Sequence, residues 1–277
     1  RLELDDEDSL TERFHGSQEV SLVDIAVIQL PRISNFTDFN PFEMIEGVSL
    51  RYVKHAGELK NPDMIILPGT KNTMEDLLWM RQNGLEAAVT KAAAAGTAIF
   101  GICGGYQMLG ERLSDPEGVE AGGEIRGMGL LPMETVFADS KTRTRVEGRF
   151  LPVEGTFGGL SGVSFEGYEI HMGVTTLSEG CRSLTRLESR SGDRVNCKQD
   201  GAWKDHIFGT YVHGVFDREE VARQIVIALG WRKGVDMSRA AGVNFTEFKE
   251  TQYDLLAKGL RESMDMEKIY QIMEEGV

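Results

Sequence analysis

The chain has 277 residues, of which 41% are hydrophobic and 27% are charged, so it is long enough to bury a large core. Its net charge is −14 and no cluster of lysine and arginine stands out, which argues against a nucleic-acid partner. Its apolar runs are strand-sized, far short of the ~20 residues that a membrane-spanning helix needs. The three cysteines, Cys103, Cys181 and Cys197, form no CxxC pair, so the sequence predicts neither a metal site nor a disulfide framework.

The N-terminal part of the chain predicts a linker followed by strands. Residues 1–20 contain an acidic cluster and few apolar side chains, so we expect a solvated linker there. Leu22–Leu30 is rich in branched residues and stops at Pro31, which is typical of a strand. Two more strands are predicted at Val48–Val53 and Met64–Leu67.

Helices and strands then alternate along the chain. Thr73, with Asp76 three residues later, resembles a helix N-cap, and we expect its helix to run through Met80. Leu85–Ala95 is a strong helix former, and the strand Thr97–Ile102 follows it. This alternation predicts an α/β fold with a mixed, mostly parallel sheet, helices on both faces, and functional residues at the carboxyl ends of the strands.

The second half of the chain has a different texture. Gly118–Val174 is rich in glycine and contains short alternating runs such as Phe165–His171, which predict antiparallel strands. An amphipathic helix is expected to end at Gly230. We therefore place the main domain at 21–232 and a small C-terminal helical extension at 233–277.

The most informative segment is Gly101–Gly105, which follows a strand and precedes a predicted helix at Tyr106–Leu113. A sharp strand-to-helix turn needs small residues two positions before and two positions after its central residue, and both positions here are glycine. The turn exposes Cys103 near a helix N-terminus, which favours the thiolate form. The pattern predicts a nucleophile elbow, although a buried core cysteine is the alternative.

A nucleophilic cysteine needs a base, and two histidines are candidates. His213 lies in the apolar run Phe208–Phe216 and is followed by a glycine, which places it at the end of a predicted strand. His171, in another predicted strand, is the rival. We rank His213 first, with a buried core histidine as the alternative interpretation.

Acyl transfer also needs donors for the oxyanion of the tetrahedral intermediate. The amide of Gly104, directly after the cysteine, is one candidate, and the turn at Pro68–Thr70 offers Gly69 as the second. An ordinary strand-ending turn is the alternative. The chain has no phosphate-binding loop, because the spaced Gly-Lys-Ser/Thr pattern is missing.

Five motifs, in this order along the chain, resemble one family, the C-terminal glutamine amidotransferase domains of cobyric acid synthases. They are LPRISNFTDF (30–39), ILPGTKNT (66–73), GICGGYQMLG (101–110), GYEIHMG (167–173) and GTYVHGVFD (209–217). The resemblance covers the chain from Leu22 to its end. It implies a class I glutamine amidotransferase-like, flavodoxin-like fold.

The resemblance also implies roles for single residues. Cys103 matches the family's nucleophile and His213 its catalytic histidine. Gln107, four residues after the cysteine, matches a position that contacts the substrate glutamine in related domains. Gly69 matches the oxyanion turn, and we include His171 among the candidate substrate-binding residues.

One position departs from the common pattern. Most amidotransferases with a catalytic triad carry a glutamate two residues after the histidine, and this chain has Val215 there. The carboxylates Asp205, Glu169 and Asp217 are possible substitutes. We expect instead a Cys-His dyad without a nearby carboxylate, because the segment around Val215 is apolar.

The family's full-length enzymes also carry an N-terminal ATP-dependent synthetase domain. No such domain is present, and the first residue is not methionine, so we expect a piece of a longer cytoplasmic protein. The resemblance implies that glutamine is the substrate, that ammonia amidates a corrinoid, adenosylcobyrinic acid a,c-diamide, and that ATP and magnesium bind the missing domain. This chain itself is expected to hold no cofactor. The alternatives are an amidotransferase for another acceptor, of the cobyrinic acid diamide synthase or cell-wall lipid type, and a non-catalytic docking domain.

Overall fold

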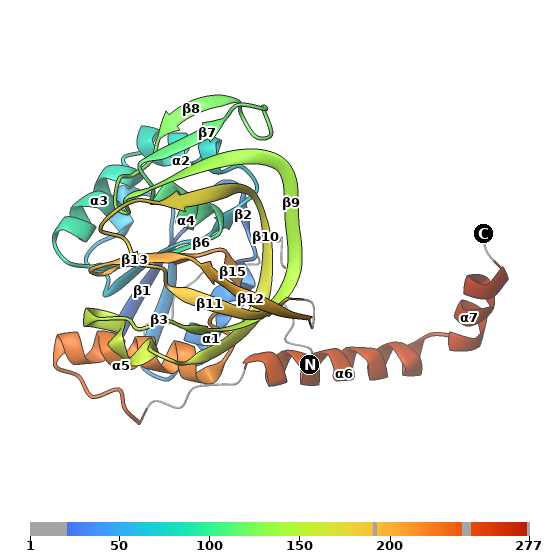
Figure 1. Cartoon of the computed structure of the whole chain (residues 1–277). Coiled ribbons are helices and arrows are strands. Elements are labelled where there is room, and N and C mark those ends of the chain that lie inside the picture. The colour runs from blue at the N-terminus through green and yellow to red at the C-terminus, as the bar shows by residue number, and fades with distance from the viewer. Residues whose placement is uncertain (1–20, 191–192, 240–244, 276–277) are drawn as a thin grey trace.

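The computed structural model describes residues 21–190, 193–239 and 245–275 (Figure 1). The segment 1–20, predicted as a linker, lies outside this part of the chain. Among the described residues, no helix is both long enough and apolar enough to cross a bilayer.

A six-stranded sheet forms the centre of the molecule. Its order is β13-β14-β6-β4-β1-β3, and every pairing is parallel except that of β13 with β14. The strands are β1 (Val23–Ile28), β3 (Val48–Val53), β4 (Met64–Leu67), β6 (Ala98–Ile102), β13 (Ala202–Lys204) and β14 (Ile207–Thr210). β4 and β6 are buried along their whole length, as expected for parallel strands covered on both faces.

Helices cover both faces of this sheet (Figure 1). On one face α1 (Asn40–Glu43) packs beside α5 (Glu219–Lys233), and the other face carries α2 (Thr73–Gln82), α3 (Leu85–Ala94) and α4 (Gly104–Met108). The 3-10 helices are η2 (Phe36–Phe39), η3 (Ala56–Glu58) and η4 (Gly155–Leu160). The predicted α/β class with helices on both faces is confirmed.

A second, mainly antiparallel sheet arches over one edge of the first (Figure 1). Its strands are β7 (Arg112–Asp115), β8 (Gly123–Arg126), β9 (Met133–Phe150), β10 (Ser164–Leu177), β11 (Thr185–Arg190), β12 (Asp193–Asp200) and β15 (Val212–His213). A separate short antiparallel pair consists of β2 (Ile33–Ser34) and β5 (Gly69–Thr70). The antiparallel strand predicted at Phe165–His171 is the first half of β10.

The helix expected to end at Gly230 is α5, which runs three residues further, to Lys233. Three other predicted elements differ more from the structure. Asn72, not Thr73, caps α2, because its side chain accepts the amide of Glu75 at 2.9 Å. The helix predicted at Tyr106–Leu113 ends at Met108, since the next residues turn into the second sheet, where Glu111 donates its amide to Met133.

The third difference is the segment Phe208–Phe216, predicted as one strand. It is two strands in different sheets: β14 pairs with β6, and β15 pairs with β10. The chain therefore crosses from the central sheet to the second sheet at Tyr211.

The C-terminal extension is helical, as expected. It consists of α6 (Phe245–Ser263) and α7 (Met266–Glu275). Figure 1 shows α6 running away from the two sheets, with α7 at its far end.

Candidate active site

The elbow at Cys103 has the predicted geometry. Cys103 joins β6 to α4 with φ 51° and ψ −109°, a conformation that costs a non-glycine residue about 1–3 kcal/mol. A Cβ at Gly101 would lie 2.8 Å from the carbonyl carbon of Gly105, and a Cβ at Gly105 would lie 2.0 Å from the oxygen of Leu67. Only glycine fits at either position, and the turn is held by the amide of Cys103, which donates to Thr210 at 2.9 Å.

The side chain of Cys103 borders a cavity of about 480 Å³ at the carboxyl ends of the central strands. The residue is only 7% exposed, and its thiol donates to the carbonyl oxygen of Ile170 in β10 at 3.3 Å. The second sheet thus forms one wall of the cavity. A volume within ~300–1,000 Å³ is typical of small-molecule sites.

His213 is buried beside this cysteine and is held by a carboxylate. Its Nδ1 lies 2.7 Å from Oδ2 of Asp38, whose Oδ1 accepts the amide of Gly214 at 3.0 Å. Because a carboxylate only accepts, Nδ1 carries the proton and Nε2 is left for the reacting groups. Nε2 is buried and has no hydrogen-bond partner among the described residues. The Tyr168 ring stacks on the imidazole at 5.3 Å between centroids.

The surroundings of His213 favour its charged form. Burial alone lowers the pKa of the imidazole, but the negative charges of Asp38 and Cys103 outweigh burial and raise that pKa from 6.5 to about 10. The site therefore stabilises the imidazolium form of His213.

The expectation of a dyad without a carboxylate is wrong, and so is each of the three substitutes. Asp205 is exposed in the turn between β13 and β14. Glu169 is buried against Lys198, whose Nζ lies 3.3 Å away. Asp217 follows the histidine, but the carboxylate that hydrogen-bonds the His213 ring is Asp38.

Asp38 was not among the carboxylates predicted as possible partners of His213, which were Asp205, Glu169 and Asp217. Asp38 lies in η2, 175 residues before His213 in the chain. A signal was present in the quoted motif LPRISNFTDF, where this single acid stands between phenylalanines and is buried. A buried acid in an apolar run needs a partner.

Gln107 lies on α4, one turn after the cysteine, and lines the cavity. Its Oε1 accepts from the Thr73 hydroxyl at 3.0 Å, and its Nε2 donates to the carbonyl of Met172 at 3.0 Å and to the Tyr211 hydroxyl at 3.2 Å. These three bonds fix the orientation of the amide. Burial raises the pKa of Tyr211, so its hydroxyl stays neutral in this network.

His171 also lines the cavity, from β10. Its ring stacks on Tyr211 with 3.8 Å between centroids, and its Nε2 lies 3.5 Å from Oε1 of Glu169. The contact between His171 and Glu169 is electrostatic and not a hydrogen bond, because the separation of the two atoms is too long. His171 forms part of the wall, and the carboxylate-bound histidine is His213.

The two predicted oxyanion glycines lie close together, but only one lines the cavity. Gly104 begins α4 and borders the cavity. Gly69 packs against His213 and Ser34: a Cβ there would lie 2.8 Å from Cε1 of the imidazole. Its neighbour Thr70 lines the cavity instead. Gly69 and Thr70 together form β5, whose position is secured by the Thr70 hydroxyl donating to the buried Asp76 at 2.6 Å.

The cavity also carries charge of both signs. Glu120 and Lys71 are the acidic and the basic residue in its lining, apart from histidine. Burial raises the pKa of Glu120, and its carboxylate accepts the amide of Met74 at 3.0 Å. Asp115 organises the loop that carries Glu120 by accepting its amide at 2.8 Å.

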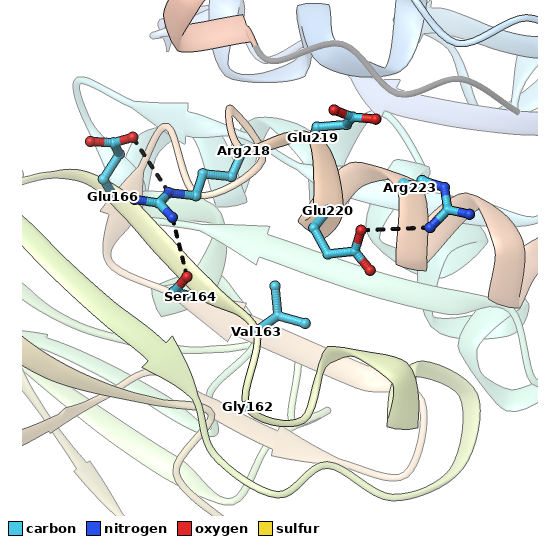
Figure 2. A pocket seen from close by; sticks show the side chains of 8 residues that line it. All are labelled: Gly162, Val163, Ser164, Glu166, Arg218, Glu219, Glu220 and Arg223. Atoms are coloured by element: carbon cyan, nitrogen blue, oxygen red, sulfur yellow. Dashed lines mark hydrogen bonds and ion pairs between the residues drawn. The ribbon is translucent and has the colours of Figure 1, made fainter.

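A second hollow of about 690 Å³ lies elsewhere, between the start of β10 and the start of α5 (Figure 2). Four of its five charged side chains form two ion pairs, Arg218 with Glu166 at 3.4 Å and Arg223 with Glu220 at 3.5 Å. No cysteine or histidine lines it, so the cavity at Cys103 is the candidate active site.

An elbow cysteine next to a histidine and a carboxylate, on a parallel sheet, is the arrangement of enzymes that act through a covalent acyl intermediate. The family model of CobB/CobQ-like glutamine amidotransferase domains matches residues 24–221. The chain belongs to this family, and it is a glutamine-hydrolysing amidotransferase domain.

Two curated relatives and two solved structures agree with this result. The cobyric acid synthase of Ruminiclostridium cellulolyticum is 57% identical over 276 residues, which are 100% of this chain and 54% of that protein. The cobyric acid synthase of Lachnoclostridium phytofermentans is 49% identical, over 100% of this chain and 55% of that protein. The chain thus spans about half the length of these relatives.

Among solved structures, PurLQS from Thermotoga maritima aligns with a TM-score of 0.57 at 18% identity, over 75% of this chain and 99% of that one. A structure titled glutamine amidotransferase aligns with a TM-score of 0.53 at 20% identity, over 75% of this chain and 98% of that one. These two similarities show the class I amidotransferase fold.

Proposed function

We propose that this chain is the glutaminase part of a cobyric acid synthase. It hydrolyses glutamine and supplies ammonia for the ATP-dependent amidation of adenosylcobyrinic acid a,c-diamide in cobalamin biosynthesis. The observation that carries the proposal is the contact of Asp38 with His213 beside Cys103, in a chain that matches cobyric acid synthases over its full length.

The first half-reaction forms a thioester. The thiolate of Cys103 attacks the side-chain carboxamide carbon of glutamine, and the amide of Gly104 with that of Gly69 or Thr70 stabilises the oxyanion. His213, charged at the start, passes its Nε2 proton to the departing nitrogen, which leaves as ammonia. Asp38 orients the ring and stabilises its charge throughout.

The second half-reaction returns the site to its starting state. Neutral His213 takes a proton from water, and the hydroxide attacks the thioester carbonyl. The carbon–sulfur bond breaks, glutamate leaves, and Cys103 is again a thiolate facing an imidazolium. No further co-reactant is needed.

The charges of the cavity suit glutamine as the substrate. A free α-amino acid carries one ammonium and one carboxylate, and the cavity presents Glu120 and Lys71. Gln107 and His171 line the same cavity as candidate substrate-binding residues. The fixed amide of Gln107 supports this role because a preoriented polar group loses no freedom on binding.

The remaining partners belong to the part of the protein outside this chain. We infer that an N-terminal synthetase domain binds ATP and magnesium and holds the corrinoid, because the matched relatives extend over about twice this length. We also infer a cytoplasmic location, where a catalytic thiol stays reduced.

The experiment uses the natural protein at the length of its relatives, with the corrinoid, ATP and either glutamine or ammonium chloride. Cys103→Ser should lose glutamine-dependent amidation and keep ammonia-dependent amidation. Amidation of a different acceptor but not of the corrinoid would overturn the assignment, and so would full glutamine-dependent activity in the variant.

A further inference from the structure

The C-terminal helices present an exposed apolar surface. The described residues include 12 large hydrophobic side chains that are exposed, and seven of them lie in or beside α6 and α7. They are 45–74% exposed and comprise Tyr253, Leu255, Leu260, Met264, Tyr270, Ile272 and Met273. Single exposed apolar residues are ordinary, but a concentration of this kind marks an interaction site.

Their spacing places most of these side chains on continuous stripes. In α7, Met266, Ile269, Tyr270 and Met273 follow the i, i+3, i+4, i+7 pattern of one helix face. Towards the end of α6, Leu260 is followed by Met264 four residues later, and the amide of Met264 donates to Leu260 at 2.9 Å, so the helical turn continues. An amphipathic helix of this kind needs another apolar surface to cover its stripe.

The amidotransferase domain covers only the start of α6. Phe245 is buried and donates its amide to the carbonyl of Asp217 at 3.0 Å, and Gln252 is buried as well. Beyond these first two turns α6 leaves the sheets, and α7 lies farther out still (Figure 1). The apolar stripes are therefore available to a partner.

The position of the domain's first residues indicates which partner lies within reach. Leu22, just before β1, lies against Gly47, and so does Met237, a few residues before α6. The described domain therefore begins close to the start of the C-terminal extension. The cobyric acid synthase relatives match this chain over its whole length, both helices included, and have nearly as much sequence again before it.

We propose that the apolar face of α6 and α7, defined by Leu260, Met264, Tyr270 and Met273, packs against the N-terminal half of the longer protein. The contact clamps that half to the amidotransferase domain. The polar sides of both helices carry more acidic than basic residues, which disfavours an anionic membrane as the occupant. The proposal does not depend on the glutaminase activity, so either one can fail alone.

Hydrogen–deuterium exchange tests the contact. Backbone amides of α6 and α7 should exchange at least about ten-fold more slowly in the natural protein of the relatives' length than in this chain alone. The double variant Leu260→Asp, Tyr270→Asp in the longer protein should restore the fast exchange. The matched control Lys258→Asp, an exposed position on α6 outside the stripe, should leave the protection intact.

Three results would overturn the proposal. One is equal exchange of the two helices in the long and short forms. Another is protection of the helices in this chain alone, together with a dimer in sedimentation, which would make a second copy the occupant. The third is a natural protein no longer than this chain. Glutaminase activity of the double variant, measured in parallel, confirms that the domain is folded.

Discussion

At the scale of single residues, the central feature is the buried contact between Asp38 and His213. Both oxygens of the carboxylate are used, one by the imidazole Nδ1 and the other by the amide of Gly214. This double contact aligns the ring and holds its tautomer, the role that the missing glutamate at Val215 has in related enzymes. Val215 instead packs in the core.

Replacing this carboxylate should disable the site without removing the nucleophile. Asp38→Asn keeps the size of the side chain but loses the charge that stabilises the imidazolium, so glutaminase kcat should fall on the order of 10⁴-fold. Asp205→Asn, at an exposed turn, is the matched control and should stay within about two-fold of the parent. Full activity in the Asp38→Asn variant would show that Cys103 and His213 act as a dyad that does not need this carboxylate.

The raised pKa of His213 predicts a pH dependence whose sign follows from linkage. The folded-state pKa of about 10 exceeds the ordinary 6.5, so the stabilisation by charged His213 is fully present below pH 6.5 and is lost as pH rises through about 10. The alkaline limb of kcat/KM should therefore lie near pH 10 and move to lower pH in Asp38→Asn. An unmoved limb in the residual activity of the variant would contradict the assignment.

At the scale of elements, the elbow explains why glycine occupies both sides of Cys103. Gly105→Ala would place a methyl group 2.0 Å from the backbone oxygen of Leu67, which cannot move without disturbing β4. We expect a loss of about 3 kcal/mol in the free energy of unfolding and no measurable glutaminase. Gly57→Ala, where no atom lies within 4 Å of the added Cβ, should change the stability by less than about 0.5 kcal/mol.

Urea unfolding of the two variants measures this difference. A Gly105→Ala protein as stable and active as the parent would show that the strand-to-helix turn does not require glycine at position 105.

The bounds of elements that depend on neighbouring residues in the sequence could be predicted. The bounds of elements that depend on contacts with residues distant in the sequence could not. The apolar runs at Val48–Val53 and Met64–Leu67 match β3 and β4 residue for residue. The break inside Phe208–Phe216 arises from the buried Asp200, which accepts the hydroxyl of Thr210 and the amide of Tyr211. The apolar run itself does not indicate that a carboxylate from outside the run interrupts the strand.

The same distinction holds within the site. Cys103 and its glycines form a local turn, so the sequence alone indicates the candidate nucleophile. The partner of His213 comes from a 3-10 helix near the other end of the chain, and only the folded arrangement brings the two together. Thr73 and Tyr211, which orient Gln107, were missed for the same reason.

At the scale of the whole molecule, the site exists because two sheets meet. Cys103 directly follows β6, β15 contains His213, and β10 closes the cavity with the carbonyl of Ile170. The candidate nucleophile therefore follows a strand of the central sheet, and the candidate base lies in the second sheet. Neither sheet alone forms the candidate active site.

Labelling with a glutamine analogue that carries a diazo-ketone tests the central claim most directly, because it reports the nucleophile and needs no partner domain. One adduct per chain should form, on Cys103, and Cys103→Ala should abolish it. Cys181 should stay unlabelled, because burial raises the pKa of its thiol. The His213→Ala and Asp38→Asn variants should label much more slowly than the parent. An adduct on Cys181, or labelling of Cys103 at the parent's rate in both variants, would contradict the account.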